Sequence, residues 1–387
     1  EVVRIEKPAP GGLGYLLARR KVRRVIESID PDVVHAHRIT SYGLWGASFR
    51  RKHPTIPLLI NVWGEDVFSF PRRSPIHQAL TKHVLQTADQ ICSTSEIMKT
   101  ETERYVSPLR PIIVTPFGVD VERFHPTESP GSPPGTRTAA NNVNGTAALR
   151  RSLGADHSGH DTGAPVVIGT VKKLRPRYGV DLLIRSFAQA RRQMPDVDLR
   201  LHVVGAGPQR DELVALAETL GLTVWVKDSA GPGVAVPTVP FDRATVRFFG
   251  RIPNTEVPAQ LRGFDIFAAL SVTDDESFGV AMIEASATGV PVVSTTVGGI
   301  PEVVMHRQTG ILVPPRDQSA ATDALISLAG SPTMRARMGA AGRAFVTERY
   351  SEISTGDRMA QVYRDLAAKG PVSQHGGEKN NRGVYRD

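Results

Sequence analysis

Residues 276–293 read ESFGVAMIEASATGVPVV and combine a polar loop, a helix and a short apolar strand. Glu276 ends the loop, Phe278 and Gly279 are expected to open the helix, and Glu284 lies further along it; the strand is expected over 291–294. The first amides of a helix have no intrahelical partner, and the helix dipole adds partial positive charge there. Residues 277–280 are therefore a predicted seat for a diphosphate, with a carboxylate at each edge to hold sugar hydroxyls. Acids near a helix start also occur because they complement the dipole, so this stretch alone leaves both interpretations open.

The same alternation of strands and helices extends over most of the chain. In the first part we expect helices over 14–28, 44–51, 75–87 and 96–105, and strands over 32–37, 57–62, 90–93 and 111–115, with a loop at 64–66. In the second part we expect strands over 166–171, 199–204, 245–249, 265–270, 291–294 and 310–313, helices over 180–193, 209–220 and 256–261, a loop insertion over 229–242, and closing helices over 320–329, 334–349 and 354–367. This pattern predicts two doubly wound, Rossmann-like α/β domains with parallel sheets.

Composition divides the chain into segments. A length of 387 residues exceeds one typical domain. Ser, Pro, Gly, Thr and Asn dominate after Thr127, where hydrophobic periodicity disappears except in a short helix expected over 147–153. The segments are an N-terminal domain over 1–126, a low-complexity linker or insertion over 127–164, a C-terminal domain over 165–350, a C-terminal helix over 351–368 expected to pack back toward the N-terminal domain, and a disordered tail over 369–387. The chain opens at Glu1 with a helix and no strand, so we expect the first domain to be incomplete through loss of upstream sequence.

Charge and cysteine content limit the environment and the partners. No apolar run approaches the roughly 20 residues that span a membrane, and the N-terminus carries no secretory signal pattern. The single cysteine, Cys92, excludes an internal disulfide framework, so we expect a cytoplasmic protein. The net charge of +8 gathers at residues 19–24, 50–52 and 72–73. This basic surface could attach peripherally to the anionic inner face of the plasma membrane or be a solvated face. Nucleic-acid binding is not expected, because the sequence shows no recognition motif and few aromatic residues for base stacking.

Two further loops follow predicted strands of the second domain. Residues 169–179 read GTVKKLRPRYG, and several cations at the end of a strand suit a phosphate site, although a generic basic loop would look the same. Gly205-Ala206-Gly207-Pro208 begins like a dinucleotide fingerprint, but Arg210 replaces the third glycine, so a tight turn before a helix is the preferred interpretation.

Other chemistries have weaker support. Asp274-Asp275-Glu276 could bind a divalent cation, but no other ligand cluster accompanies it, and no metal is expected. A glycosidase would also need two carboxylates, and their spacing along the chain does not exclude one. His35 and His37 should point to the same face of a strand, facing either a cleft or the core.

Taken together, these segments resemble the "glycosyl transferases group 1" family of retaining, nucleotide-sugar-dependent enzymes with the GT-B fold, in which two Rossmann-like domains face each other across a cleft. The resemblance covers most of residues 32–365, and its specificity comes from the order and spacing of the motifs. The matching runs are PFGVD at 116–120 with Phe124, the 169–179 loop, GAGP at 205–208, FGR at 249–251, the Glu-x7-Glu motif of Glu276 and Glu284, GVPVV at 289–293, GGIPE at 298–302 and GILV at 310–313.

The resemblance implies roles for the two acids and the helix start between them. Glu276 would contact the donor sugar near the reacting centre, and Glu284 would hold the ribose hydroxyls. Phe278, Gly279 and Val280 would offer backbone contacts to the sugar and the diphosphate.

It also implies roles for the basic loop and its neighbours. The two basic phosphate-binding residues of the family correspond to Lys173 and Arg177, because Tyr178 stands where lysine is usual and Arg177 would supply that charge. Arg251 would lie near the nucleotide base, and Gly205 belongs to the donor-binding residues.

The first domain departs from the family pattern in two ways. Trp63 stands where many members carry a cleft histidine, and it joins His37 and Asp66 as an expected acceptor-side residue. The opening strand and the Gly-rich loop of the family are absent, which leaves open whether the chain is active without them.

The resemblance implies transfer of a hexose from a nucleotide-diphosphate sugar, UDP- or GDP-linked, to a hydroxyl of a lipid-linked or cell-surface saccharide. The anomeric configuration would be retained, and no cofactor or metal is expected. Two alternatives are a truncated remnant that binds nucleotide sugar without turnover and a nucleotide-sugar epimerase, which can share the two-domain architecture. Base, sugar, linkage and oligomeric state cannot be inferred from the sequence.

Overall fold

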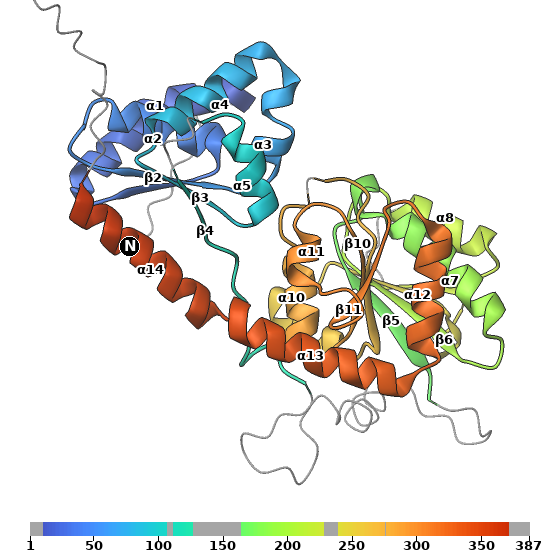
Figure 1. Ribbon diagram of the computed structural model, residues 1–387. Coiled ribbons are helices and arrows are strands. Elements are labelled where there is room, and N and C mark those ends of the chain that lie inside the picture. Colours follow the sequence, from blue (N-terminus) through green and yellow to red (C-terminus); the bar gives the residue numbers. More distant parts are fainter. Residues whose placement is uncertain (1–10, 107–110, 127–163, 228–238, 275, 371–387) are drawn as a thin grey trace, which may run out of the picture. The chain divides into compact units, whose positions relative to one another are not determined.

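The computed structural model describes residues 11–106, 111–126, 164–227, 239–274 and 276–370, which form two compact units (Figure 1). Of these residues, the first unit comprises 11–93, 99–106, 111–113 and 359–370, and the second comprises 94–98, 114–126, 164–227, 239–274 and 276–358. Residues 114–126, expected in the N-terminal domain, belong to the second unit instead. Nearly all of the expected linker and tail, and the expected helix over 147–153, lie outside the described residues.

The first unit contains a parallel sheet of four strands in the order β1-β2-β3-β4. Its strands are β1 (Val34–His37), β2 (Leu58–Val62), β3 (Gln90–Ser93) and β4 (Ile112–Val114), and its helices are α1 (Gly11–Ile29), α2 (Leu44–Arg50), α3 (Glu65–Phe68), α4 (Pro75–Thr87) and parts of α5 (Glu96–Glu103) and α14 (Glu352–Lys369). Every residue of β2 is buried, as expected of an inner strand. Leu59 of β2 packs with Cys92 and with Val362 and Leu366 of α14, so this last helix covers one face of the sheet.

Short helix α3 replaces the loop expected at residues 64–66. Asp66 accepts hydrogen bonds from the backbone N–H groups of Trp63 and Gly64, 3.0 and 2.9 Å long. Gly64 has a φ of 130°, which a residue with a side chain rarely adopts. The Asp66 carboxylate thereby ties the first turn of α3 to the two residues that precede it.

The second unit contains a parallel sheet of seven strands in the order β11-β10-β9-β5-β6-β8-β7. The strands are β5 (Val166–Val171), β6 (Leu199–Val204), β7 (Val224–Val226), β8 (Val246–Gly250), β9 (Ile266–Ala269), β10 (Val292–Thr295) and β11 (Gly310–Val313). The helices are α7 (Val180–Gln193), α8 (Arg210–Thr219), α9 (Val257–Arg262), α10 (Val280–Ala287), α11 (Ile300–Val303), α12 (Gln318–Ala329) and α13 (Pro332–Tyr350). Most match the expected elements to within two residues, but β7 and α11 were not expected, and both are very short.

Along the inner strands of this seven-stranded sheet, alternate residues pack into two separate hydrophobic cores. Ile168 of β5 lies in a core with α7, α8 and α12, whereas Val167 lies in a second core with α9, α10 and α11. Figure 1 shows α7, α8 and α12 together on one side of this sheet. The alternation is what a strand imposes on a sheet covered on both faces, and it confirms the α/β class predicted from the sequence. Among the described residues, no helix is both long and apolar enough to cross a bilayer.

Candidate functional site

The strand order places a topological switch point in the second unit between β5 and β9. From β5 the chain moves to β6 on one side, and it later returns to β9 on the other side of β5. Ligands of doubly wound sheets bind at such a point, beyond the carboxyl ends of the strands. The segment after β5 is the basic loop 172–179, and the segment after β9 contains Glu276. The fold thus brings together the two stretches that the sequence singles out.

Glu276 is held by an ion pair at this point. Its Oε2 lies 2.8 Å from Nζ of Lys172 and accepts a hydrogen bond of 3.1 Å from Oγ of Ser271. The side chains of Lys172 and Glu276 are only 9% and 14% exposed, so the pair is largely removed from water. The Lys172 ammonium also lies 5.1 Å from the centre of the Tyr178 ring, within range of a cation–π interaction. A buried, oriented carboxylate beside a cation can bind a polar ligand with little reorganisation.

Three glycines let the surrounding loops approach each other closely. A Cβ atom at Gly205 would overlap the carbonyl oxygen of Lys172, one at Gly179 would overlap that of Leu270, and one at Gly298 would overlap that of Glu276. All three glycines have positive φ, of 143°, 61° and 51°. Their role is to pack the backbones that carry the site. For Gly205 this agrees with the tight turn preferred from the sequence.

Helix α10 begins at Val280, two residues later than the expected start at Phe278. Gly279 precedes it with a φ of 98° and aligns the chain for the first turn. The Phe278 side chain is 2% exposed and its ring contacts those of Phe117 and Tyr350, at 5.9 and 5.4 Å between centres. Because this ring is committed to the core, only the backbone of Phe278 could contact a ligand. The backbone contacts implied by the family resemblance remain a prediction.

Glu284 lies on α10 and is partly buried. Burial raises the pKa of its carboxyl group from 4.5 to about 7, although the positive charges of Arg123 and Lys172 oppose this rise. Lys172 therefore acts electrostatically on both acids of the site. Arg123 was not singled out in the sequence; it joins the site because residues 114–126 belong to the second unit.

The remaining predicted donor-side residues are the cations Lys173, Arg177 and Arg251. Lys173 and Arg251 are exposed, and Arg251 follows directly after β8. Arg177 is partly buried, and its guanidinium carbon lies 5.1 Å from the centre of the Tyr178 ring. The residue that reaches Glu276 is Lys172, one position before the lysine chosen from the sequence. The only sequence signal for it was the presence of two adjacent lysines.

The predicted acceptor-side residues lie in the first unit, at the carboxyl ends of β1 and β2. The rings of His35 and His37 are 4.0 Å apart, which agrees with the same strand face, and His37 lies 5.3 Å from Trp63. Nδ1 of His35 lies 2.6 Å from the hydroxyl of Tyr363 on α14. Burial, with a smaller effect of His37, lowers the pKa of His35 to about 4, and burial also lowers the pKa of His37. His35 is consequently neutral at pH 7.

Asp66 is 3% exposed and hydrogen-bonds to the residues that follow these two strands. Besides the bonds from Trp63 and Gly64 after β2, it accepts a bond of 3.0 Å from the backbone N–H of Ile39 after β1. Burial raises the pKa of Asp66, while its backbone hydrogen bonds work in the opposite direction. Because its oxygens serve backbone donors, the structure supports a role in positioning His37 and Trp63 rather than in touching a substrate.

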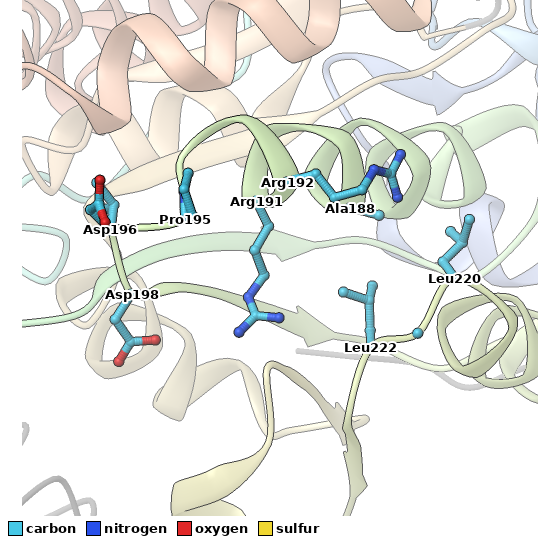
Figure 2. Close-up of a pocket in the computed structure, with 10 residues that line it drawn as sticks. Ala188, Arg191, Arg192, Pro195, Asp196, Asp198, Leu220 and Leu222 are labelled. Atoms are coloured by element: carbon cyan, nitrogen blue, oxygen red, sulfur yellow. The ribbon is translucent and has the colours of Figure 1, made fainter.

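A cavity of about 900 Å³ lies at the other end of the second sheet (Figure 2). Its lining includes Arg191 and Arg192 at the end of α7 and Asp196 and Asp198 before β6. This is the amino end of the strands, opposite to where doubly wound folds bind ligands. Its charges have both signs, so it is not the candidate site.

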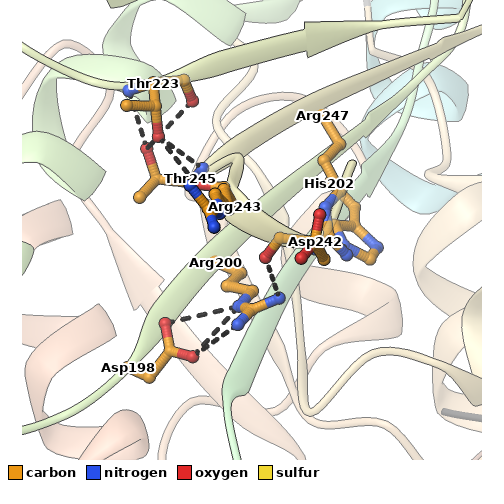
Figure 3. Close-up of polar contacts among 8 residues, drawn as sticks. All are labelled: Asp198, Arg200, His202, Thr223, Asp242, Arg243, Thr245 and Arg247. Carbon is orange, nitrogen blue, oxygen red and sulfur yellow. Dashed lines mark hydrogen bonds and ion pairs between the residues drawn. The ribbon is translucent and has the colours of Figure 1, made fainter. Parts of the chain in front are cut away.

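Asp198, one of the charged residues that line that cavity, belongs to a polar network on strands β6 to β8 (Figure 3). Arg200 pairs with Asp198 at 2.8 Å and donates a bond of 3.1 Å to the Asp242 carbonyl. On β8, Nη1 of the buried Arg247 lies 3.2 Å from Nε2 of His202, and burial lowers the pKa of Arg247 to about 10. Thr223 and Thr245 exchange backbone-to-hydroxyl bonds, each 3.0 Å long, and hold β7 against β8. These groups stabilise the edge strands.

Comparison with known proteins identifies the family. The profile of "Glycosyl transferases group 1" matches residues 165–331, and that of "Glycosyl transferase 4-like" matches residues 1–95. Residues 165–331 of the chain therefore form a domain of the glycosyl transferases group 1 type. The part that the first profile matches includes the switch point, the basic loop and both glutamates.

Two relatives are mannosyltransferases. The GDP-mannose-dependent alpha-(1-6)-phosphatidylinositol monomannoside mannosyltransferase of Mycolicibacterium smegmatis is 30% identical over 293 residues, which cover 74% of this chain and 65% of the relative. The GDP-mannose-dependent monoacylated alpha-(1-6)-phosphatidylinositol monomannoside mannosyltransferase of Corynebacterium glutamicum is 32% identical over 252 residues, covering 64% and 54%. The chain thus spans less than two thirds of the length of each of these two relatives.

Solved structures show the same fold. Sucrose-phosphate synthase from Thermosynechococcus elongatus has a TM-score of 0.71 at 22% identity, covering 92% of this chain and 79% of that chain. HepE from Anabaena, in complex with UDP and glucose, has a TM-score of 0.70 at 21% identity, covering 93% and 84%. These similarities confirm the predicted GT-B type of α/β architecture.

Proposed function

We propose that this group 1 glycosyltransferase moves a hexose from a nucleotide-diphosphate sugar to an acceptor hydroxyl with retention of anomeric configuration, and that its second unit holds the donor. One observation carries the proposal. The switch point between β5 and β9 holds the partly buried Glu276 and Glu284, and Lys172 acts electrostatically on both. Two acids that share one cation suit a ligand that carries both hydroxyls and phosphates.

The residues divide the chemistry among them. Glu276 contacts the sugar near the reacting carbon, Glu284 accepts hydrogen bonds from the ribose hydroxyls, and the backbone of residues 278–280 faces the diphosphate. In an oxocarbenium-like transition state, negative charge grows on the leaving diphosphate. One lysine of the basic loop and Arg177, together with the free amides at the start of α10, stabilise that charge. The leaving phosphate accepts the proton of the acceptor hydroxyl, and transfer proceeds without a metal ion.

The acceptor is a lipid-linked or cell-surface saccharide that meets the first unit near His37 and Trp63. The names of the two mannosyltransferase relatives support this class, because both contain a phosphatidylinositol mannoside. The same names make GDP-mannose the first donor to test, and the UDP bound in HepE makes UDP-glucose the second. Basic residues on α1 support peripheral attachment to an anionic membrane on the cytoplasmic side. Flotation with phosphatidylinositol vesicles should be lost in high salt.

The test is a transfer assay with GDP-mannose or UDP-glucose and a phosphatidylinositol mannoside acceptor. We expect a product whose anomeric configuration, read by NMR, equals that of the donor, with a rate unchanged by EDTA. Glu276→Gln should abolish turnover, whereas Glu218→Gln, an exposed glutamate on α8, should not change it. Conversion of donor without acceptor would indicate an epimerase. Donor binding with no transfer to any acceptor would indicate a binding remnant and would refute the proposal.

A further inference from the structure

We infer that Lys172, rather than Lys173, is the lysine that meets the donor diphosphate, and that Glu276 is its counter-ion until the diphosphate replaces it. This inference rests on the proposed function and assigns the basic loop a specific exchange of partners. It follows from the direction of two adjacent side chains: Lys173 is exposed, whereas Lys172 turns into the switch point and reaches Glu276 at 2.8 Å.

The backbone around Lys172 explains why its direction is set. Its N–H donates to the carbonyl of Val204 at 3.0 Å, and its own carbonyl lies against Gly205, where a Cβ atom would not fit. Two residues later, Leu174 donates to the Ala206 carbonyl at 3.1 Å and is fully buried. Because the side chains of Lys172 and Leu174 both point into the protein, that of Lys173 between them points to solvent.

Tyr178 makes the exchange possible at a position where the family usually has lysine. Its ring centre lies 5.1 Å from the Lys172 ammonium and 5.1 Å from the Arg177 guanidinium, so one aromatic ring contacts both cations. Lys172 and Arg177 together then supply the two charges that the family's two basic phosphate-binding residues would supply. The charge that lysine usually supplies at position 178 thus comes from another position of the same loop.

The present partner of Lys172 is suited to being replaced. A buried ion pair gains little net stability, because the loss of hydration of both charges offsets their attraction. A diphosphate brings at least two negative charges to the same ammonium and can take it from a single carboxylate. The exchange frees Glu276 to accept hydrogen bonds from the sugar hydroxyls. Binding of the diphosphate thereby makes the Glu276 carboxylate available to the sugar.

Calorimetric titration of the full chain with UDP and GDP tests the exchange, since both probes carry the diphosphate without the sugar. We expect Lys172→Met to weaken binding about 10- to 100-fold, the range for a hydrogen bond to a charged group. Lys172→Arg should retain most of the affinity. The matched control is Arg175→Met, which removes an exposed cation from the same loop and should change affinity less than about twofold.

Glu276→Gln separates an exchange from a structural ion pair. If Glu276 competes with the diphosphate, this variant binds UDP or GDP as tightly as wild type or several-fold more tightly, even though transfer is lost. If the pair only shapes the loop, Glu276→Gln and Lys172→Met weaken binding alike, and the inference is refuted. A loss in Lys173→Met with none in Lys172→Met would also overturn it. Failure of the wild-type chain to bind either nucleotide would refute the proposed donor site itself, and the inference with it.

Discussion

Replacing Glu284 by glutamine should make the second unit more stable and its nucleotide site weaker. Burial raises the pKa of Glu284 from 4.5 to about 7, so between these values the folded state holds a proton that the unfolded chain has released. Folding stability from this group is therefore greatest at low pH and falls as pH rises through this window. From pH 5 to pH 8 the loss amounts to roughly 2 to 3 kcal/mol.

Glutamine does not ionise, so Glu284→Gln removes this dependence. Above pH 7 the variant should exceed wild type in free energy of unfolding by roughly 3 kcal/mol, and near pH 4 the two should be equal. Nucleotide affinity should move in the opposite direction, because the ribose hydroxyls lose a charged acceptor. For the same reason, wild-type affinity should decline as pH falls below 7.

Urea denaturation followed by tryptophan fluorescence measures the effect in the second unit. Trp225 is the one tryptophan of that unit among the three of the chain, so Trp45→Phe and Trp63→Phe in the background isolate its signal. Glu218→Gln, on the surface of α8, should follow the wild-type curve at every pH. If wild type and Glu284→Gln lose the same stability between pH 5 and pH 8, the buried acid is not the cause and the reasoning is wrong.

Two further substitutions test the backbone supports of the sites. Asp66→Ala leaves three backbone N–H groups without their acceptor and should lower the free energy of unfolding of the first unit by about 3 kcal/mol or more. Asp66→Asn keeps an acceptor oxygen and should lower this free energy less. Equal losses of the two variants in urea denaturation would contradict this explanation. Gly205→Ala places a methyl group against the carbonyl of Lys172 and should lower both stability and UDP or GDP affinity. Gly221→Ala, at a φ of 76° with open space around it, should cost only about 1 to 2 kcal/mol, so equal stability of the two alanine variants would count against the packing argument.

Elements with a complete local signal could be predicted from the sequence. The bounds of β5, α7 and β6 agree with expectation, because alternating or amphipathic apolar residues lie between clear turn residues. Strand β7 has only three residues, and it exists because it pairs with β8 and exchanges threonine bonds with it. A local pattern cannot show that contact, since the partner strand lies about 20 residues further along the chain.

The division between the units also depended on distant contacts. Val119 lies in a segment that was expected in the N-terminal domain. Its N–H donates to the carbonyl of Tyr350 at 2.8 Å, and its own carbonyl accepts from Glu352 at 3.0 Å. These bonds join parts of the chain more than 200 residues apart and place residues 114–126, with Arg123, in the second unit.

By itself, the sequence determined the α/β class, the family motifs and the pairing of Glu276 and Glu284 around a helix start, because periodicity and motif spacing are local properties. Tertiary structure alone decided which of the two lysines pairs with Glu276. Lys172 and Lys173 are chemically identical neighbours, and only the hydrogen bonds and the glycine packing between the loops after β5 and β6 turn one inward and the other to solvent. The raised pKa of Glu284 has the same origin, since burial is a property of the assembled sheet and helices.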